Sequence, residues 1–233
     1  NAGYCTIRDI YVDGQGPSQT ATAAPGIYWY IGVSEDVNCH YNFIDNVWAY
    51  NCLGGGTYHS TSTRTNIGKV FGYNNGGHPT APQLRALVNM EGATNSIIGQ
   101  LIDMGSRAGA LSLTGGCSGI SAKGLSFGAI SWPAQLEACV NCDIDLTVKS
   151  SETGNGMTIF GVTTGTTIKL RGDYTVPFVF GADFSVAGNK IHDMTVPSVV
   201  KLDLSSGATD IEIYHTNKAG VIVGARVDYT EAS

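Results

Sequence analysis

The stretches Asn42–Asn51, NFIDNVWAYN, and Thr65–Asn74, TNIGKVFGYN, decide the fold. The two align without a gap, so that Trp48 falls on Phe71. The isoleucine, the valine, the second aromatic residue and the final asparagine of the two stretches also coincide. The chain therefore repeats a structural unit at this point with a period of about 23 residues, and a repeat of that length indicates a stacked architecture.

A similar spacing recurs in the C-terminal half of the chain, where two interleaved series of apolar residues run at intervals close to that period. One series is Ile120, Cys142, Ile168, Ile191 and Ile211, and the other is Leu111, Leu136, Ile159, Phe180, Leu202 and Ile222. Each interval holds two short segments with alternating apolar residues and a turn of Gly, Thr or Asn between them, which is the pattern of β-strands. The sequence predicts two short strands in every repeat.

A unit of about 20 to 25 residues with short strands cannot bury its apolar face alone, and stacking of such units solves the problem. Leucine-rich repeats share the period but need far more leucine, and helical repeats need longer units with a period of 3.6. Glycine makes up 31 of the 233 residues and suits sharp corners. Asn42, Asn95 and Asn189 each stand two residues before an isoleucine, where amides of successive coils can bond. We therefore predict an all-β parallel β-helix, one coil per repeat, as a single domain over 1–233.

Charge and hydropathy narrow the class of protein. The 13 basic and 19 acidic residues give a net charge of −6, opposite in sign to a nucleic-acid binder. No stretch approaches the ~20 apolar residues of a membrane helix, so neither nucleic acid nor membrane insertion is expected. The chain begins at Asn1 without a signal peptide, and we expect it to be a piece of a longer protein.

Signatures of metals and cofactors are absent from the sequence. Cys139-x-x-Cys142 is a lone pair without a histidine at zinc-finger spacing, and Gly54-Gly55-Gly56 lacks the lysine of a phosphate loop. We expect no metal and no cofactor. The six cysteines are expected to be small buried side chains, with a disulfide as the alternative.

Aromatic residues recur at the outward positions of the repeat. If Val47 and Ala49 face inward, Trp48 and Tyr50 face outward, since neighbouring side chains of a strand point to opposite sides. Tyr73 and Phe71 then lie one coil further on, and Tyr11 takes the place of Trp48 in the first coil. A strip of ring faces suits the apolar C–H faces of sugars. Cover by a loop or a neighbouring subunit is the alternative.

Three long connections interrupt the repeat in the N-terminal third of the chain. The first, within Gln15–Val37, carries Trp29, Tyr30, Glu35 and Asp36. The second and third carry His59 and Arg85. Binding and catalysis concentrate in such loops, whereas the evenly spaced C-terminal half leaves little room for a site.

The period, the Asn-x-Ile corners and the Ser/Thr/Gly-rich exterior resemble the right-handed parallel β-helix of bacteriophage tailspikes and tail-fibre depolymerases. The resemblance covers nearly the whole chain and predicts about eight to ten coils. It implies a homotrimer in the extracellular virion tail that binds, and usually cleaves, a bacterial capsular or O-antigen polysaccharide. It further implies a pair of carboxylates as the catalytic groups.

Glycoside hydrolysis needs one carboxyl group as the acid and another as the base or nucleophile. The candidate catalytic residues are Glu35, Asp36, Asp13 and Asp45, with Asp103 as a further acid. The candidate substrate-binding residues are Trp29, Tyr30, Trp48, Tyr50, Tyr73, His59 and Arg85. A polysaccharide lyase, with His and Arg near a uronate, and a non-catalytic receptor-binding fibre segment stay open as alternatives.

Overall fold

The structure is a computed structural model of the 233-residue chain. It describes residues 3–14, 33–35, 39–52, 54–76, 86–107, 109–129, 132–149, 155–174, 176–180, 189–193, 202–203, 211–216 and 222–227. This part of the chain is all-β and contains no helix. No helix in these ranges is therefore long and apolar enough to cross a membrane.

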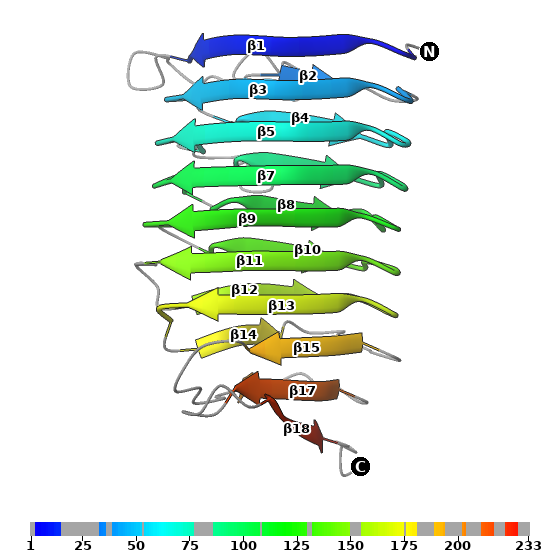
Figure 1. Ribbon diagram of the computed structural model, residues 1–233, viewed down its shortest axis with the longest axis vertical. Coiled ribbons are helices and arrows are strands. Elements are labelled where there is room, and N and C mark those ends of the chain that lie inside the picture. Colours follow the sequence, from blue (N-terminus) through cyan, green and yellow to red (C-terminus); the bar gives the residue numbers. More distant parts are fainter. Residues whose placement is uncertain are drawn as a thin grey trace.

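The described strands form two sheets (Figure 1). The large sheet consists of β1 (Thr6–Asp13), β3 (Phe43–Tyr50), β5 (Asn66–Tyr73), β7 (Ile97–Met104), β9 (Ser121–Phe127), β11 (Asp143–Lys149), β13 (Thr167–Gly172), β15 (Asn189–Asp193), β17 (Ile211–Thr216) and β18 (Ile222–Val227). The small sheet consists of β2 (Val33–Glu35), β4 (Thr57–Ser60), β6 (Val88–Glu91), β8 (Leu111–Thr114), β10 (Ala134–Glu137), β12 (Asn155–Phe160), β14 (Val176–Phe180) and β16 (Leu202–Asp203).

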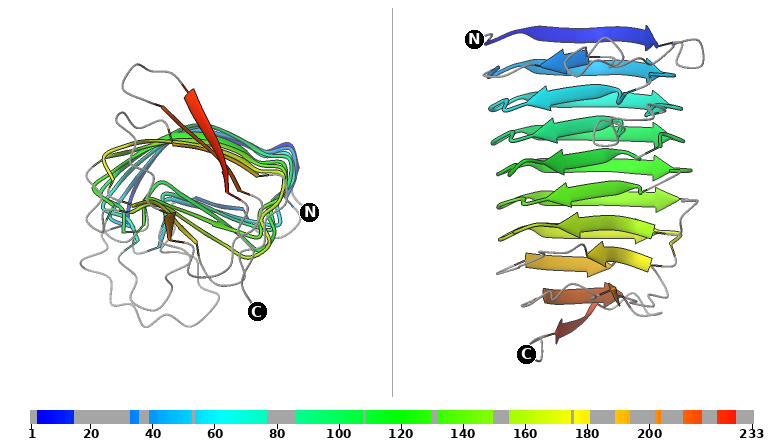
Figure 2. Two further views of the ribbon diagram at one scale, coloured as in Figure 1. Left: turned by 90° about the horizontal axis from the view of Figure 1, so that it is seen from below. Right: turned by 180° about the vertical axis from the view of Figure 1, so that it is seen from behind.

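Up to β17 the odd-numbered strands belong to the large sheet and the even-numbered strands to the small sheet, so each repeat adds one strand to each sheet. Neighbouring strands pair in parallel throughout both sheets up to β17. The sheets face each other across an interior that runs the length of the stack (Figure 2). This arrangement is consistent with the parallel β-helix that the repeat predicts. Trp48 lies beside Phe71 and Tyr50 beside Tyr73 in the paired strands β3 and β5, which confirms the predicted register.

Aliphatic side chains of successive repeats stack in the interior. Ile44 pairs with Ile67 and Ile67 with Ile98, and each is almost fully buried. Burying one such side chain stabilises the fold by about 1.5–3 kcal/mol, and the column continues through β11 and β13. The predicted inward direction of Val47 and Ala49 is confirmed, because both are fully buried.

Polar side chains connect successive repeats at the corners. The backbone N–H of Cys5 donates to Asn42 Oδ1 at 2.9 Å, and that of Thr166 donates to Asn189 Oδ1 at 2.7 Å. Asn189 Nδ2 also donates to the Thr163 carbonyl at 2.7 Å. These two asparagines occupy the expected corner position.

Asn95, the third asparagine of the prediction, is exposed and does not take part. Its neighbour Ser96 holds the position instead, and Ser96 Oγ accepts the Thr65 N–H at 3.1 Å. The corner ladder therefore needs a side-chain oxygen that can accept a backbone N–H, which Asn, Ser and Thr can all supply.

The last described strand departs from the expected repeat. The sequence predicts that Ile222 continues the apolar series that begins at Leu111. In the structure, β18 pairs antiparallel with β17, and Ile222 lies beside Thr216. The prediction is wrong at this point because β18 turns back along its neighbour. The spacing along the chain is compatible with either arrangement.

Candidate functional site

An aromatic surface lies on the outer side of the large sheet, at its N-terminal end. The rings of Trp48 and Phe71 stack with centroids 4.2 Å apart and an interplanar angle of 11°. The rings of Tyr11 and Tyr50 lie 5.0 Å apart. We call the surface of Tyr11, Trp48, Tyr50, Phe71 and Tyr73 the aromatic face. In β3 and β5 these aromatic residues alternate with the buried Ala49 and Gly72 and therefore lie on the outer side, as predicted, and Tyr11 pairs with Trp48 in the register of β1 and β3.

The aromatic face is open to solvent. Tyr11 is 69% exposed, Tyr73 54% and Trp48 36%. Within the described residues no other segment covers these rings, and the apolar surface continues over Met104 and Phe127, which are also exposed. An exposed apolar surface of this extent marks an interaction site.

The pairing of the strands beneath this surface becomes irregular between β7 and β9. The first two strands of the large sheet each contain a residue with positive φ near their middle, Asp9 in β1 and Asn46 in β3. The pairing of β7 with β9 shifts register between Ile98 and Leu101, so that β9 is one residue shorter. Such β-bulges occur beside binding sites. The regular pairing of the N-terminal strands therefore ends at this register shift between β7 and β9, which we call the step.

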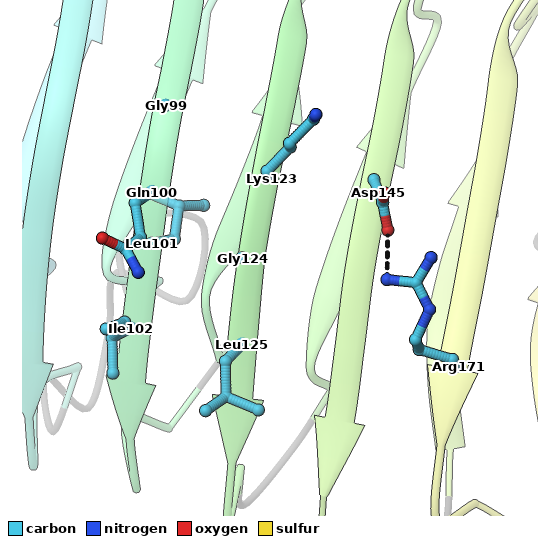
Figure 3. Close-up of a pocket in the computed structure, with 9 residues that line it drawn as sticks. All are labelled: Gly99, Gln100, Leu101, Ile102, Lys123, Gly124, Leu125, Asp145 and Arg171. Carbon is cyan, nitrogen blue, oxygen red and sulfur yellow. Dashed lines mark ion pairs between the residues drawn. The ribbon is translucent and has the colours of Figure 1, made fainter.

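A groove of about 520 Å³ opens on the outer face at this step (Figure 3). Gly124 forms part of its wall, and a Cβ atom there would lie 2.6 Å from Leu101 Cβ, so the position requires glycine. Arg171 Nη1 lies 2.6 Å from Asp145 Oδ1 within the groove. The remaining side chains that line it include Gln100, Ile102, Lys123 and Leu125.

The candidate acids Asp13 and Asp45 flank the aromatic face. Asp13 pairs with Tyr50 in the register of β1 and β3, and its Oδ1 accepts from Asn51 Nδ2 at 3.3 Å. The carboxylate of Asp45 reaches over Gly68 of the next strand, where a Cβ atom would clash with Asp45 Oδ1. Both acids lie on the outer side of the sheet, as predicted.

Glu35 and His59 meet in the interior rather than on the outer surface. They are 4% and 0% exposed, and Glu35 Oε2 lies 2.5 Å from His59 Nδ1. Glu35 also accepts from Asn42 Nδ2 at 2.5 Å and from Thr65 Oγ1 at 3.1 Å. His59 Nε2 lies 3.1 Å from Thr57 Oγ1. His59 thus belongs to β4 and not to a loop, and these two candidates lie apart from the aromatic face.

Opposing effects set the pKa of Glu35. Burial by itself raises it, but the hydrogen bond and the charge of His59 lower it, as do the hydrogen bonds from Asn42 and Thr65. The net direction of the pKa is downward, so the carboxyl group is held in its ionised form.

Asp103 also points into the interior. It lies between Gly72 and Ser126 in the paired strands and is fully buried. Ser106 and Ser126 approach it, but neither carboxylate oxygen has a partner in hydrogen-bond geometry within the described residues. Burial raises the pKa of Asp103 to about 7. This acid is therefore not near the aromatic surface, contrary to the expectation.

Four candidates, Trp29, Tyr30, Asp36 and Arg85, lie outside the described residues. Sequence reasoning missed the groove because its residues come from four strands of the evenly spaced half of the chain. The signal that was available is the loss of one residue between β7 and β9, together with Gly124 at a position where other repeats carry Val or Leu.

In the described ranges no group of three or more His, Cys, Asp or Glu side chains is arranged to hold a metal. All six cysteines are free thiols; Cys52, Cys117, Cys139 and Cys142 are buried, as expected, whereas Cys5 is exposed. Searches with family models, among curated proteins and among solved structures found no match to this chain. The site must therefore be interpreted from its own geometry.

Proposed function

We propose that this protein is a right-handed parallel β-helix that binds a bacterial surface polysaccharide along the aromatic face. The observation that carries the proposal is the exposed stack of Trp48 on Phe71 with Tyr50 and Tyr73 beside it. Ring faces carry the negative side of the aromatic quadrupole, which attracts the weakly positive C–H groups of a sugar ring. Trp48 and Phe71 cover one face of each other, so an extended sugar chain would contact the outer edges of this stack and the more exposed rings of Tyr11 and Tyr73. Successive strands lie about 4.8 Å apart, so these contacts repeat along the chain.

The wider proposal is a tailspike-type receptor-binding protein of a virion tail, acting outside the cell as a homotrimer. It is supported by the stacked parallel strands and by the exposed aromatic face. A capsule or O-antigen chain is long and regular, which matches a surface whose binding groups repeat with each strand.

Hydrolysis of the bound polysaccharide is the second candidate function. Asp13 and Asp45 favour it, because both carboxylates flank the aromatic face on adjacent strands. In the register of β1 and β3, however, Asp45 pairs with Arg8 and Asp13 pairs with Tyr50, so the two acids stand about 16 Å apart at ~3.3 Å per residue. Paired carboxyl groups of glycosidases lie about 5–9.5 Å apart, so each of these acids would need another carboxyl group as its partner. The buried pair of Glu35 and His59 is not part of this proposal, since its atoms face the interior.

Binding to purified capsular and O-antigen polysaccharides tests the main proposal. Trp48→Ala should weaken binding at least about fivefold, which corresponds to the loss of about 1 kcal/mol of ring contact. Tyr4→Ala is the matched control, since Tyr4 is 79% exposed and lies outside the aromatic face. The control should change the dissociation constant less than twofold. Equal effects of the two variants, or no binding by the unaltered protein, would overturn the proposal.

Analysis of the polysaccharide after incubation tests hydrolysis separately. Saturated oligosaccharides that disappear with Asp13→Asn or Asp45→Asn would support it, and products with an unsaturated end would indicate a lyase. Binding with no fragments would leave a non-catalytic receptor-binding protein.

A further inference from the structure

On the outer side of strands β5 to β13 the positive charges outnumber the negative ones, opposite to the balance of the whole chain. The strands β5 to β13 carry five outward cations, Lys69, Lys123, Lys149, Lys169 and Arg171, against two outward anions, Asp143 and Asp145. Asp173, which follows β13 and pairs with Lys149, adds a third anion, so the net charge of this surface is +2, although the chain carries −6. A local positive field on an acidic protein attracts anionic ligands to one place.

Most of these cations are already paired. Arg171 binds Asp145 at 2.6 Å, Lys149 lies 3.3 Å from Asp173, and Lys169 lies 3.9 Å from Asp143. The exposed Lys123, which lines the groove, forms no ion pair with a described residue. Among the described residues that line the groove, Lys123 is thus a cation without an anionic partner.

The groove combines this free charge with features that suit a sugar ring. Ile102 and Leu125 present apolar side chains, and Gln100 adds an exposed amide that can donate and accept hydrogen bonds. Figure 3 shows Gln100, Lys123 and the pair of Asp145 and Arg171 on successive strands around the hollow. The volume of about 520 Å³ lies within the range of small-molecule sites.

The groove also continues the aromatic face along the stack. Ile102 pairs with Phe71 and Leu125 pairs with Ile102, so the column of Trp48 and Phe71 runs directly into the groove. A polymer that lies on the aromatic face would therefore place a following unit beside Lys123.

We propose that the groove binds an acidic sugar unit of the polysaccharide, with the sugar carboxylate on Lys123 and the ring against Ile102 and Leu125. The inference rests on the proposed function, because it names the chemical class of the chain that the aromatic face binds. A single carboxylate matches the charge of Lys123, and Asp145 disfavours a second negative charge beside it. Arg171 is oriented by Asp145 and borders the same hollow.

The test compares acidic polysaccharides with their neutral forms. Polygalacturonate, alginate and hyaluronate, each before and after chemical reduction of its carboxyl groups, are titrated into the unaltered protein at about 150 mM salt, the physiological level. The native form of at least one polymer should bind at least tenfold more tightly than its reduced form, as expected for a charge-assisted hydrogen bond.

The variant Lys123→Gln should remove this preference and leave binding of the reduced polymer unchanged. Lys190→Gln is the matched control, because Lys190 is exposed on β15 outside the groove and the change in net charge is the same. Equal losses in the two variants would overturn the inference in favour of unspecific attraction.

Failure of the inference and failure of the proposed function give different results. Equal binding of native and reduced polymers that is lost in Trp48→Ala would overturn the acidic-sugar inference and leave the aromatic face as a polysaccharide site. Absence of binding to every polymer, native or reduced, in addition to capsule and O-antigen, would overturn both.

Discussion

Asp103 lies in an environment that opposes the ordinary preference of a carboxyl group, because it is fully buried. A carboxyl group that is fully buried without hydrogen-bond partners is stable only in its neutral form. Its pKa of about 7 compares with an ordinary value of 3.8. Between these two values the folded state keeps a proton that the unfolded state has released, so the stability falls as the pH rises from about 4 to about 7.

Asp103→Asn should remove this pH dependence, because the amide cannot ionise. We expect the variant to be more stable than the unaltered protein by up to about 4 kcal/mol at pH 8, and the difference to vanish toward pH 4. Urea unfolding across this pH range measures the effect. A difference that stays constant from pH 4 to pH 8 would contradict the buried neutral acid.

The buried pair of Glu35 and His59 leads to a second prediction at the residue scale. His59→Leu leaves the Glu35 carboxylate buried without its partner and should cost about 3–5 kcal/mol. The double variant Glu35→Leu with His59→Leu should be more stable than His59→Leu alone, since the same column carries Met90 and Leu113 in later repeats. Urea unfolding of the two single variants and the double variant gives the coupling free energy between Glu35 and His59. A double variant less stable than His59→Leu would refute this role.

The lowered pKa of Glu35 leads to a further prediction: the contribution of Glu35 to the stability of the folded state is lost in acid. Its pKa is lowered in the folded state, so its stabilising effect is present above the ordinary value of about 4.5 and is lost as the pH falls through the folded value. This trend is opposite to that of Asp103. The contributions of Glu35 and Asp103 can therefore be distinguished when the stability of the variants Glu35→Leu and Asp103→Asn is measured over a series of pH values.

At the scale of the elements, the corner bonds hold neighbouring repeats in register. Asn189→Ala removes the partners of the Thr166 N–H and the Thr163 carbonyl, and each buried group left unpaired costs about 1–3 kcal/mol. We expect at least a tenfold change in the unfolding equilibrium, measured by urea unfolding. Asn66→Ala on the exposed side of β5 is the control and should stay within about 0.5 kcal/mol. Similar losses for both would show that the corner bonds do not contribute.

At the scale of the molecule, β1 is the outermost described strand at one edge of the large sheet. Among the described strands β1 has a neighbour on one side only, and Ile10 is 36% exposed where its counterpart Val47 is fully buried. Open strand edges favour association unless they are covered. We expect a homotrimer with about three times the 24.4 kDa mass of one chain in light scattering. A mass of one chain in dilute solution would contradict it.

Trp48→Ala separates the two uses of the aromatic face. If the face binds polysaccharide, the variant keeps the trimer mass and loses the ligand. If a neighbouring subunit covers the face, the variant loses the trimer instead, and the proposed binding site would be wrong.

The repeat and the side-chain directions could be predicted because they depend on local periodicity. Residues in a strand alternate between two faces, and identical spacing in successive repeats places identical offsets on one column. The outward direction of Trp48 and Tyr50 and the position of Asp13 follow from this rule. Asp103 stands two residues after the buried Leu101 and faces inward by the same alternation, although we expected it among the acids near the aromatic surface.

The meeting of Glu35 with His59 and the groove at Lys123 could be seen only in the tertiary structure. Glu35 lies in a long connection between two repeats, so the sequence alone does not show with which strand it pairs or that β2 turns it inward. The groove depends on the pairing register between the neighbouring strands β7 to β13. A shift of that register by one residue turns every side chain of a strand to the opposite face of the sheet. Periodicity along the chain therefore determines which residues face outward, whereas the lateral register between strands decides which of them share a site.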